Sequence, residues 1–293
     1  MRSLCLLFLL LLLVLSAACG GPDQNGPEKE PFDPGNASFR YRPSVEQIHV
    51  WMAEPGALLE VERDGVLVAE GIADEMGSFV FRKLAPGKGY IVRCRDEYTS
   101  PLQVMSVVSS MPPPDFYTRQ KLESGFGYLT MRDGTQLSVY VTLPGPIEEG
   151  PYPTVVNYSG YSPSRPGRPL GDFDLLCDDL PVLCDAPEPP CSLFAGLMGY
   201  ATVNVNKRGT GCSGGAYDYF ETLQVLDGYD IIEIVAAQEW VLHNHVGMVG
   251  LSYPGITQLF VGRSQPPGLA AVAPLSVIGS THTTLVPGGI LND

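Results

Sequence analysis

The chain has 293 residues, enough for two domains that each bury a core of their own. Its apolar content of 44%, with 33 glycines and 27 prolines, is typical of a globular, turn-rich protein and argues against a disordered one. The formal net charge of −14 argues against a nucleic-acid partner, which would require a basic surface.

The first nineteen residues have the pattern of an export signal. Arg2 precedes the apolar run "LCLLFLLLLLVL", which is too short to span a membrane comfortably. The small residues of "LSAAC" look like a bacterial lipobox, in which Cys19 is acylated, although Ser16 stands where leucine is more usual. An ordinary cleaved signal peptide and a short membrane anchor are the alternatives. We expect an exported lipoprotein of the cell envelope, held on a membrane through Cys19 and followed by a flexible tether over residues 20–44.

Export allows the remaining cysteines to form disulfides. Five cysteines follow the signal: Cys94, Cys177, Cys184, Cys191 and Cys212. The three in "CDDLPVLCDAPEPPC" lack the close pairs of a zinc site, so no metal site is predicted. We expect one disulfide within that loop and consider a second to Cys212, and the odd count leaves at least one thiol free or partnered elsewhere.

Residues 45–110 have the pattern of a small all-β domain. "ALLEVERDGVLVAEG" is two alternating runs joined through Asp64-Gly65, which predicts a hairpin, and "GSFVFRKL" and "YIVRC" follow as strands. This spacing predicts an immunoglobulin-like β-sandwich. No residue cluster in it carries chemistry, and His49 and Trp51 are interpreted as packing residues. "SSMPPPDFY" then opens a linker over residues 111–124.

The pattern changes to α/β over residues 125–293. A hairpin is predicted at Asp133-Gly134. Strand-like runs then alternate with helical ones: "TVVNY", "YATVNVN", the helical "DGYDIIEIVAAQEWVL", "VGMVGLS", the helical "GITQLFVGR", and "LAAVAPLSV". This alternation predicts right-handed crossovers and a parallel sheet.

One serine lies where such a strand turns into a helix. "VGMVGLSYPG" places Ser252 at this bend, where close packing requires small neighbours, and Gly250 and Gly255 supply them. Pro254 replaces a glycine of the usual G-x-S-x-G spacing, but it falls in the first helical turn, where its missing N–H had no helical partner. We predict that Ser252 is a nucleophile; an incidental serine in a plain strand–turn–helix is the alternative.

The segment "GLSYPG" resembles the nucleophile elbow of the cocaine esterase and X-Pro dipeptidyl-peptidase family of α/β-hydrolases. "RDGTQL", "YPTVVNYSGY" and "NKRGTGCSGG" agree with the same family, and "LVPGGILN" resembles the start of its helical cap. The resemblance covers roughly residues 125–293. It implies an α/β-hydrolase core and acyl transfer through a Ser–Asp–His triad. The implied substrates are small esters, amides or X-Pro peptides, and no cofactor is implied.

The resemblance also implies an oxyanion hole. Its donors would be the hydroxyl of Tyr161 and the backbone N–H of Tyr253, because two donors from separate loops can converge where charge develops. Tyr158 lies close in sequence and is the rival for the hydroxyl role.

A glycine-rich turn offers a different enzyme class. "GTGCSG" from Gly209 to Gly214 satisfies the pattern G-x-G-x-x-G of dinucleotide sites. Such a site needs a helix opening on the glycines and an acid at the end of a second strand. "GAYDYFE" instead predicts a loop, and Asp227 and Asp230 are predicted to start the next helix. We therefore expect a turn beside the active site, with an oxidoreductase as the less favoured enzyme class.

The predicted triad is incomplete in this sequence, because its order in α/β-hydrolases is serine, acid, histidine. After Ser252 come only His282 and Asp293, in the reverse order. His243 and His245 precede the nucleophile strand and are interpreted as solvated residues at a helix end. We expect the chain to be the front part of a longer enzyme, truncated at the start of the cap, inactive by itself and aggregation-prone along an exposed sheet edge. The alternative is a non-enzymatic surface lipoprotein that binds a partner through its β-domain.

Overall fold

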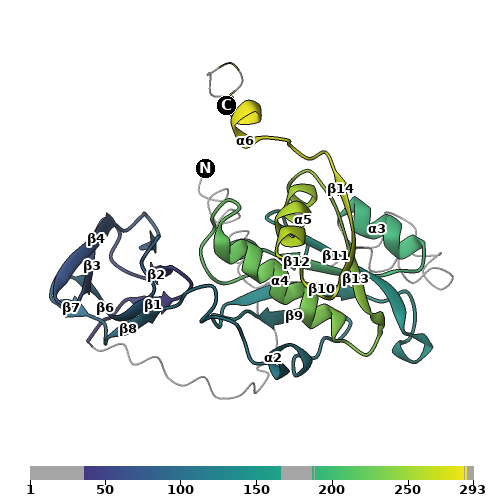
Figure 1. The fold of residues 1–293 in the computed structure, drawn as a ribbon, viewed down its shortest axis with the longest axis horizontal. Coiled ribbons are helices and arrows are strands. Elements are labelled where there is room, and N and C mark those ends of the chain that lie inside the picture. The colour runs from purple at the N-terminus through teal and green to yellow at the C-terminus, as the bar shows by residue number, and fades with distance from the viewer. Residues whose placement is uncertain (1–35, 166–186, 188, 287, 289–293) are drawn as a thin grey trace, which may run out of the picture. The chain divides into compact units, whose positions relative to one another are not determined.

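A computed structural model describes residues 36–165, 187, 189–286 and 288 (Figure 1). The predicted signal, Cys19 and most of the tether lie outside these residues, as do Cys177 and Cys184. In the part of the chain that is described, no helix is long and apolar enough to cross a membrane. The first strand, β1 (Arg40–Pro43), begins inside the segment predicted as a tether, so that prediction placed the start of ordered structure too late.

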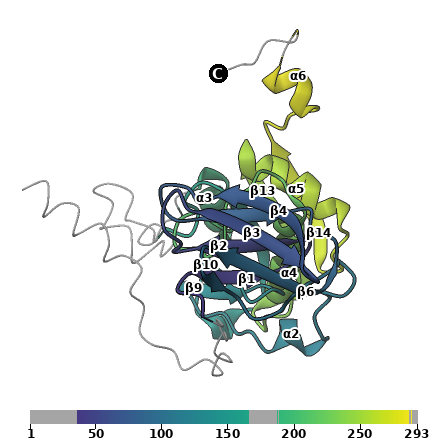
Figure 2. The same cartoon turned by 90° about the vertical axis from the view of Figure 1, so that its left-hand side faces the viewer.

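The first strands form two antiparallel sheets. One has the order β1-β2-β5, with β2 (Gln47–Trp51) and β5 (Phe79–Arg82). The other has the order β4-β3-β6-β7, with β8 also pairing with β6. Its strands are β3 (Leu58–Arg63), β4 (Val66–Ile72), β6 (Gly87–Cys94), β7 (Glu97–Tyr98) and β8 (Leu102–Val104). The neighbours β4, β3 and β6 are labelled in Figure 2. Side chains of both sheets share one buried cluster, which includes Ile48, Val61 and Val92. The immunoglobulin-like assignment of this region stays a prediction.

Local turn chemistry explains the hairpin between β3 and β4. Asp64 and Gly65 both have positive φ, 53° and 79°, which a two-residue type I′ turn requires and which aspartate and glycine tolerate. On the neighbouring sheet, the rings of His49 and Trp51 stack at 5.0 Å between centroids, and His49 Nε2 lies 3.1 Å from Ser78 Oγ. Both contacts agree with a packing role for this pair.

The second half is built on a six-stranded sheet of order β14-β13-β11-β12-β10-β9. Its strands are β9 (Gly125–Thr130), β10 (Gln136–Thr142), β11 (Tyr152–Ser159), β12 (Ala201–Asn206), β13 (Val241–Leu251) and β14 (Leu269–Leu275). The neighbouring β9, β10 and β12 pair antiparallel, and the remaining pairs are parallel, so the predicted parallel sheet is mixed at one edge. The α/β class predicted for this half is confirmed.

The helices follow from this strand order. They are α2 (Asp115–Thr118), α3 (Pro190–Leu197), α4 (Thr222–Ala236), α5 (Tyr253–Arg263) and α6 (Thr281–Leu285), with a 3₁₀ turn at Ile147–Glu149. The connection from β11 through α3 steps across the sheet in one direction, and those through α4 and α5 step in the other. Because such crossovers are right-handed, α3 covers one face and α4 and α5 cover the other (Figure 1).

The direction of winding reverses at β11, and this reversal positions the site. The strands β11 and β13 are parallel neighbours, and the chain leaves their carboxyl ends toward opposite faces of the sheet. In open α/β sheets, ligands bind in the crevice that such a switch point creates. Tyr161 follows β11 by two residues and Ser252 follows β13 directly, so both predicted site residues lie at this point.

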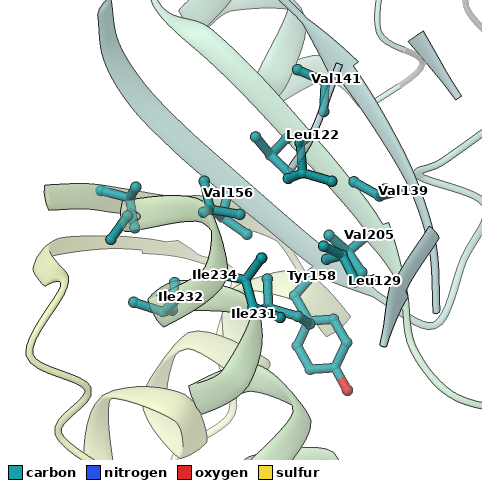
Figure 3. Packing of buried hydrophobic residues seen from close by; sticks show 14 of the residues in the cluster. Leu122, Leu129, Val139, Val141, Val156, Tyr158, Val205, Ile231, Ile232 and Ile234 are labelled. Atoms are coloured by element: carbon teal, nitrogen blue, oxygen red, sulfur yellow. The ribbon is translucent and has the colours of Figure 1, made fainter. Parts of the chain in front are cut away.

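The core of this half lies between the sheet and α4. Val139, Val156 and Val205 from three strands meet Ile231 and Ile234 of the helix, and all five side chains are fully buried (Figure 3). The helix begins at Thr222, earlier than its apolar pattern predicted. Asp227 and Asp230 therefore lie inside α4 and not at its start, which corrects the sequence interpretation.

The two histidines before the nucleophile are also placed differently. His243 and His245 belong to the first residues of β13 and not to a helix end. The pairing of β13 with β11 jumps from Val241 to Val246, so the residues between them bulge away from the ladder. Both histidines are exposed at the end of the strand opposite Ser252, as predicted for solvated residues.

Candidate active site

Ser252 occupies the turn between β13 and α5 with φ 66° and ψ −119°. A backbone of this kind costs a residue other than glycine about 1–3 kcal/mol, so its surroundings must hold it. The Ser252 N–H donates to the carbonyl of Leu275 (2.9 Å), and the Ser252 carbonyl accepts from the amides of Gly255 (2.8 Å) and Ile256 (2.9 Å). The strained strand-to-helix turn is therefore present, and the nucleophile role stays a prediction.

The glycines beside the serine are required by space. A Cβ on Gly250 would lie 2.6 Å from Cβ of Pro254, and a Cβ on Gly255 would collide with the carbonyl oxygen of Leu275. Pro254 lies in the first turn of α5, as predicted from the missing N–H. The turn thus fits the sequence G-x-S-x-P-G, with the proline in place of the glycine that other elbows use.

Tyr161 is the side chain that the structure brings to Ser252. Its hydroxyl lies 3.4 Å from Ser252 Oγ. Its backbone is held on both sides, because its N–H donates to Ser159 Oγ (3.1 Å) and its carbonyl accepts from Asn206 Nδ2 (2.8 Å). The side chain is 59% exposed, so the hydroxyl can reach a bound substrate.

Tyr158, the rival in sequence, points elsewhere. It is 1% exposed, and its hydroxyl donates to the carbonyl of Gln224 (3.3 Å). Burial raises the pKa of Tyr158 well above its ordinary value, as expected for a phenol inside a core (Figure 3). Of the two tyrosines, only Tyr161 has the geometry to act on a group bound at Ser252.

Tyr253 contributes through two different groups. Its backbone N–H is the first of α5, and the first N–H groups of a helix have no acceptor within the helix, which leaves this one free to bind an oxyanion. Its side chain is buried, and its hydroxyl accepts hydrogen bonds from Lys207 Nζ and Gln224 Nε2, both at 2.8 Å. Burial raises the pKa of the Tyr253 phenol, so it stays neutral.

The glycine-rich turn lies beside this site. Gly209 and Gly211 have φ of 72° and 57°, and a Cβ on Gly211 would lie 2.7 Å from Asn206 Nδ2, the group that holds Tyr161. The residues around the turn do not favour a dinucleotide-binding site. The two downstream acids are engaged by cations: Asp227 binds Arg208, and Asp230 binds Arg132, with shortest contacts of 2.6 and 2.7 Å.

Sequence reasoning missed the buried ionic network under this turn. Arg208 is buried and bonds both Asp227 and Asp133, the latter at 3.0 Å. The signal was present in α4, where Asp227 and Asp230 fall on the same apolar stripe as Leu223, Ile231 and Ile234. Two carboxylates on a buried helix face require buried cations, and the arginines next to glycine and aspartate in the turns are their partners.

No histidine or carboxylate completes the site among the described residues. There, the side chain hydrogen-bonded to Ser252 Oγ is that of Tyr161. His282 lies in α6 and is exposed. The same described ranges contain no grouping of three histidine, cysteine or acidic side chains suited to a metal ion. The arrangement found is a serine on a strained turn, the predicted nucleophile, with two candidate oxyanion donors.

Two cysteine predictions can be compared with the structure. Cys212, in the glycine-rich turn, is disulfide-bonded, as considered from the sequence. Cys191, in the first turn of α3, is a free thiol, as is Cys94 in β6. The expected bridge among Cys177, Cys184 and Cys191 therefore does not include Cys191, and the other two lie outside the described residues.

Comparison with known proteins gives relatives for part of the chain. A "putative serine esterase" of Mycobacterium bovis is 29% identical over 167 residues, which are 56% of this chain and 26% of that protein. The chain thus spans about a quarter of the length of the curated relatives it matches. Among solved structures, a CocE/NonD family hydrolase from Staphylococcus aureus is 27% identical with a TM-score of 0.41, over 51% of this chain and 26% of that one.

An aminopeptidase from a marine-sediment Thaumarchaeota archaeon is 22% identical with a TM-score of 0.42, over 56% of this chain and 26% of that one. The sequence model of the family described as X-Pro dipeptidyl-peptidase (S15 family) matches residues 133–293, more than half of the chain. This range contains Tyr161, the glycine-rich turn after Arg208, Ser252 and Tyr253. The resemblance found in "GLSYPG" is confirmed, and the chain belongs to the X-Pro dipeptidyl-peptidase (S15) family of α/β-hydrolases.

Proposed function

We propose that the chain carries the nucleophile and oxyanion hole of a serine acyl hydrolase. The observation that carries the proposal is the strained turn at Ser252 with the Tyr161 hydroxyl 3.4 Å from Oγ. Membership of a family of serine peptidases and esterases supports it. The substrates would be small esters, amides or peptides with proline in the penultimate position.

In the proposed reaction, Ser252 Oγ attacks the substrate carbonyl and forms an acyl-enzyme. The negative charge that develops on the carbonyl oxygen is stabilised by the Tyr161 hydroxyl and the Tyr253 N–H, which approach from β11 and α5. The alcohol or amine leaves, and water releases the acyl group in a second step. A base must accept the serine proton, and we propose that this base is a histidine held by an acid, as in the triad that the family implies.

The acyl-enzyme makes this proposal testable in the full-length protein. With a nitrophenyl ester, rapid mixing is expected to give a burst of nitrophenol close to one equivalent per protein, followed by slower turnover. A linear time course with no dependence on Ser252 would instead favour the non-enzymatic alternative, a surface protein that binds a partner through its β-domain.

Tyr161→Phe is expected to lower kcat by about a hundredfold with little change in KM, because the lost hydroxyl acts on charge that develops only in the transition state. Steady-state kinetics with the same ester measures both constants. Tyr128→Phe, on the exposed face of β9, is a matched control that should leave both unchanged. Wild-type turnover in Tyr161→Phe would move the donor role to another group.

We also propose that the protein is an exported lipoprotein of the cell envelope, with a membrane anchor on Cys19, a tether, an immunoglobulin-like domain over about residues 45–110, and a hydrolase domain from about residue 125. The lipobox-like "LSAAC" supports the anchor. Metabolic labelling with a fatty-acid analogue is expected to mark the protein, and Cys19→Ser should abolish both the label and its recovery with membranes. Unchanged labelling and fractionation in Cys19→Ser would contradict the anchor.

A further inference from the structure

Lys207 is a buried cation that the proposed reaction leaves unexplained. It follows β12 directly, and its side chain is 0% exposed. Its ammonium donates to the Tyr253 hydroxyl (2.8 Å), to Gln224 Oε1 (3.1 Å) and to the carbonyl oxygen of Asp218, and it lies 3.7 Å from the ring centroid of Tyr217. An ammonium has three N–H donors, and all three have acceptors.

These contacts form a closed polar network under the nucleophile. Lys207, Gln224 and Tyr253 are each hydrogen-bonded to the other two, since Gln224 Nε2 also donates to the Tyr253 hydroxyl (2.8 Å). The three come from different elements: the end of β12, the first turn of α4 and the first turn of α5. Phe220 stacks on the Tyr253 ring at 5.0 Å between centroids. The aromatic ring of Tyr253, the residue after Ser252, is therefore fixed in position.

The stem of Lys207 reaches the other oxyanion donor as well. A Cβ on Gly160 would lie 3.2 Å from Cδ of Lys207 and 3.3 Å from Cε1 of Tyr253. Gly160 immediately precedes Tyr161, and the rings of Tyr161 and Tyr253 lie 5.9 Å apart. The Lys207 amide also donates to the Ser159 carbonyl (2.8 Å). One side chain thus contacts both segments that carry the candidate donors.

We propose that Lys207 is a positioning residue of the oxyanion hole, which fixes the Tyr253 N–H and the Tyr161 hydroxyl relative to each other through the Tyr253 side chain. The inference rests on the proposed function of Ser252. Lys207 joins four segments that meet at the elbow: the end of β12, the loop before α4, and the first turns of α4 and α5. Burying a charge is costly unless each donor is satisfied, and here the acceptors all belong to segments around the site.

The charge of Lys207 makes the positioning dependent on pH. Burial lowers the pKa of Lys207 to about 8; the nearby carboxylates of Glu221, Asp218 and Asp227 oppose this shift, and Arg208 adds to it. The phenols of Tyr217 and Tyr253, which also face the ammonium, have pKa values raised by burial and stay neutral. Above about pH 8 the neutral amine has two N–H groups for three acceptors, so at least one of the three bonds must break or reverse its direction, and we expect the elbow to loosen.

The test uses Lys207→Met in the full-length protein, because methionine keeps the length of the stem and removes the charge. At pH 7 we expect kcat for a nitrophenyl ester to fall about tenfold with KM within about twofold, since positioning acts on the transition state. In the wild type, kcat should decline above about pH 8, and this alkaline limb should be missing in Lys207→Met. Lys121→Met, which removes an exposed lysine paired with Glu239, is the matched control and should retain wild-type kinetics.

A double-mutant cycle with Tyr253→Phe tests the route of the effect. If Lys207 acts through the Tyr253 hydroxyl, Lys207→Met should add little to the loss already caused by Tyr253→Phe. Should Lys207→Met fail to fold, as judged by circular dichroism, Tyr253→Phe alone keeps the lysine and should show the same fall in kcat at constant KM.

Unchanged kcat, a loss confined to KM, an alkaline limb that persists in Lys207→Met, or full additivity with Tyr253→Phe would each overturn the proposal. A failure of the proposed function is detected separately, by measuring Ser252→Ala in the same assays. Full activity in Ser252→Ala would contradict both the proposed function and the inference on Lys207. An inactive Ser252→Ala together with wild-type kinetics in Lys207→Met would contradict only the inference on Lys207.

Discussion

Ser252→Ala in the full-length protein is expected to lower kcat/KM for a nitrophenyl ester by about four orders of magnitude. Without the hydroxyl no acyl-enzyme forms, and only the oxyanion donors remain to assist direct attack by water. Substrate binding should survive, because the turn at Ser252 is held by backbone hydrogen bonds that alanine keeps. Stopped-flow and steady-state assays measure the burst and the turnover.

Ser264→Ala is the matched control, since Ser264 lies at the other end of α5 and its hydroxyl donates to the carbonyl of Val261 (2.6 Å). It should keep both the burst and the turnover. Residual activity of Ser252→Ala near that of the wild type would place the nucleophile elsewhere.

Arg208→Met is expected to destabilise the protein by about 3–5 kcal/mol, because it leaves buried carboxylates without their cation. Burial by itself would lower the pKa of Arg208, but Asp133 and Asp227 outweigh it and hold that pKa well above its ordinary value. Burial raises the pKa of Asp227 to about 6 even with the arginine present, so without it both carboxylates would be costly to keep ionised. The midpoint of denaturant unfolding measures the change.

The same network ties the two halves of the described chain together. Asp133 also accepts from Ser44 Oγ (2.6 Å), which lies just after β1, and Val45 packs with Leu223 and Leu226 of α4. Arg119→Met is the control, since it breaks an exposed ion pair with Asp115, and such pairs contribute little. An unfolding midpoint for Arg208→Met as close to the wild type as that of Arg119→Met would contradict the account of the network.

The sequence was sufficient to predict those parts of the structure that local chemistry decides. The Asp64-Gly65 hairpin and the strand-to-helix turn at Ser252 depend on residues that tolerate positive φ or small volume, and those needs are visible in a few letters. The α/β alternation likewise follows from the apolar periods. The choice of Tyr161 over Tyr158 was made by resemblance, and the structure supplies the physical reason, which is the burial of Tyr158.

What the sequence did not predict depends on contacts between distant segments. Nothing local distinguishes Lys207 from a surface lysine, because its acceptors lie on α4, on α5 and in the loop before α4. The early start of α4 was missed because Asp227 and Asp230 looked like polar residues of a first turn, whereas Arg208 and Arg132 allow them to be buried mid-helix. The start of β1 was missed since its pairing with β2 is set by tertiary structure.

The central claim, that Ser252 is an activated nucleophile, is tested most directly by labelling with a fluorophosphonate and mapping the adduct by peptide mass spectrometry. The full-length protein should acquire one adduct, on Ser252, and Ser264→Ala should acquire the same one. Ser252→Ala should remain unlabelled. A full-length protein that takes no label, or an adduct that persists in Ser252→Ala, would contradict the account.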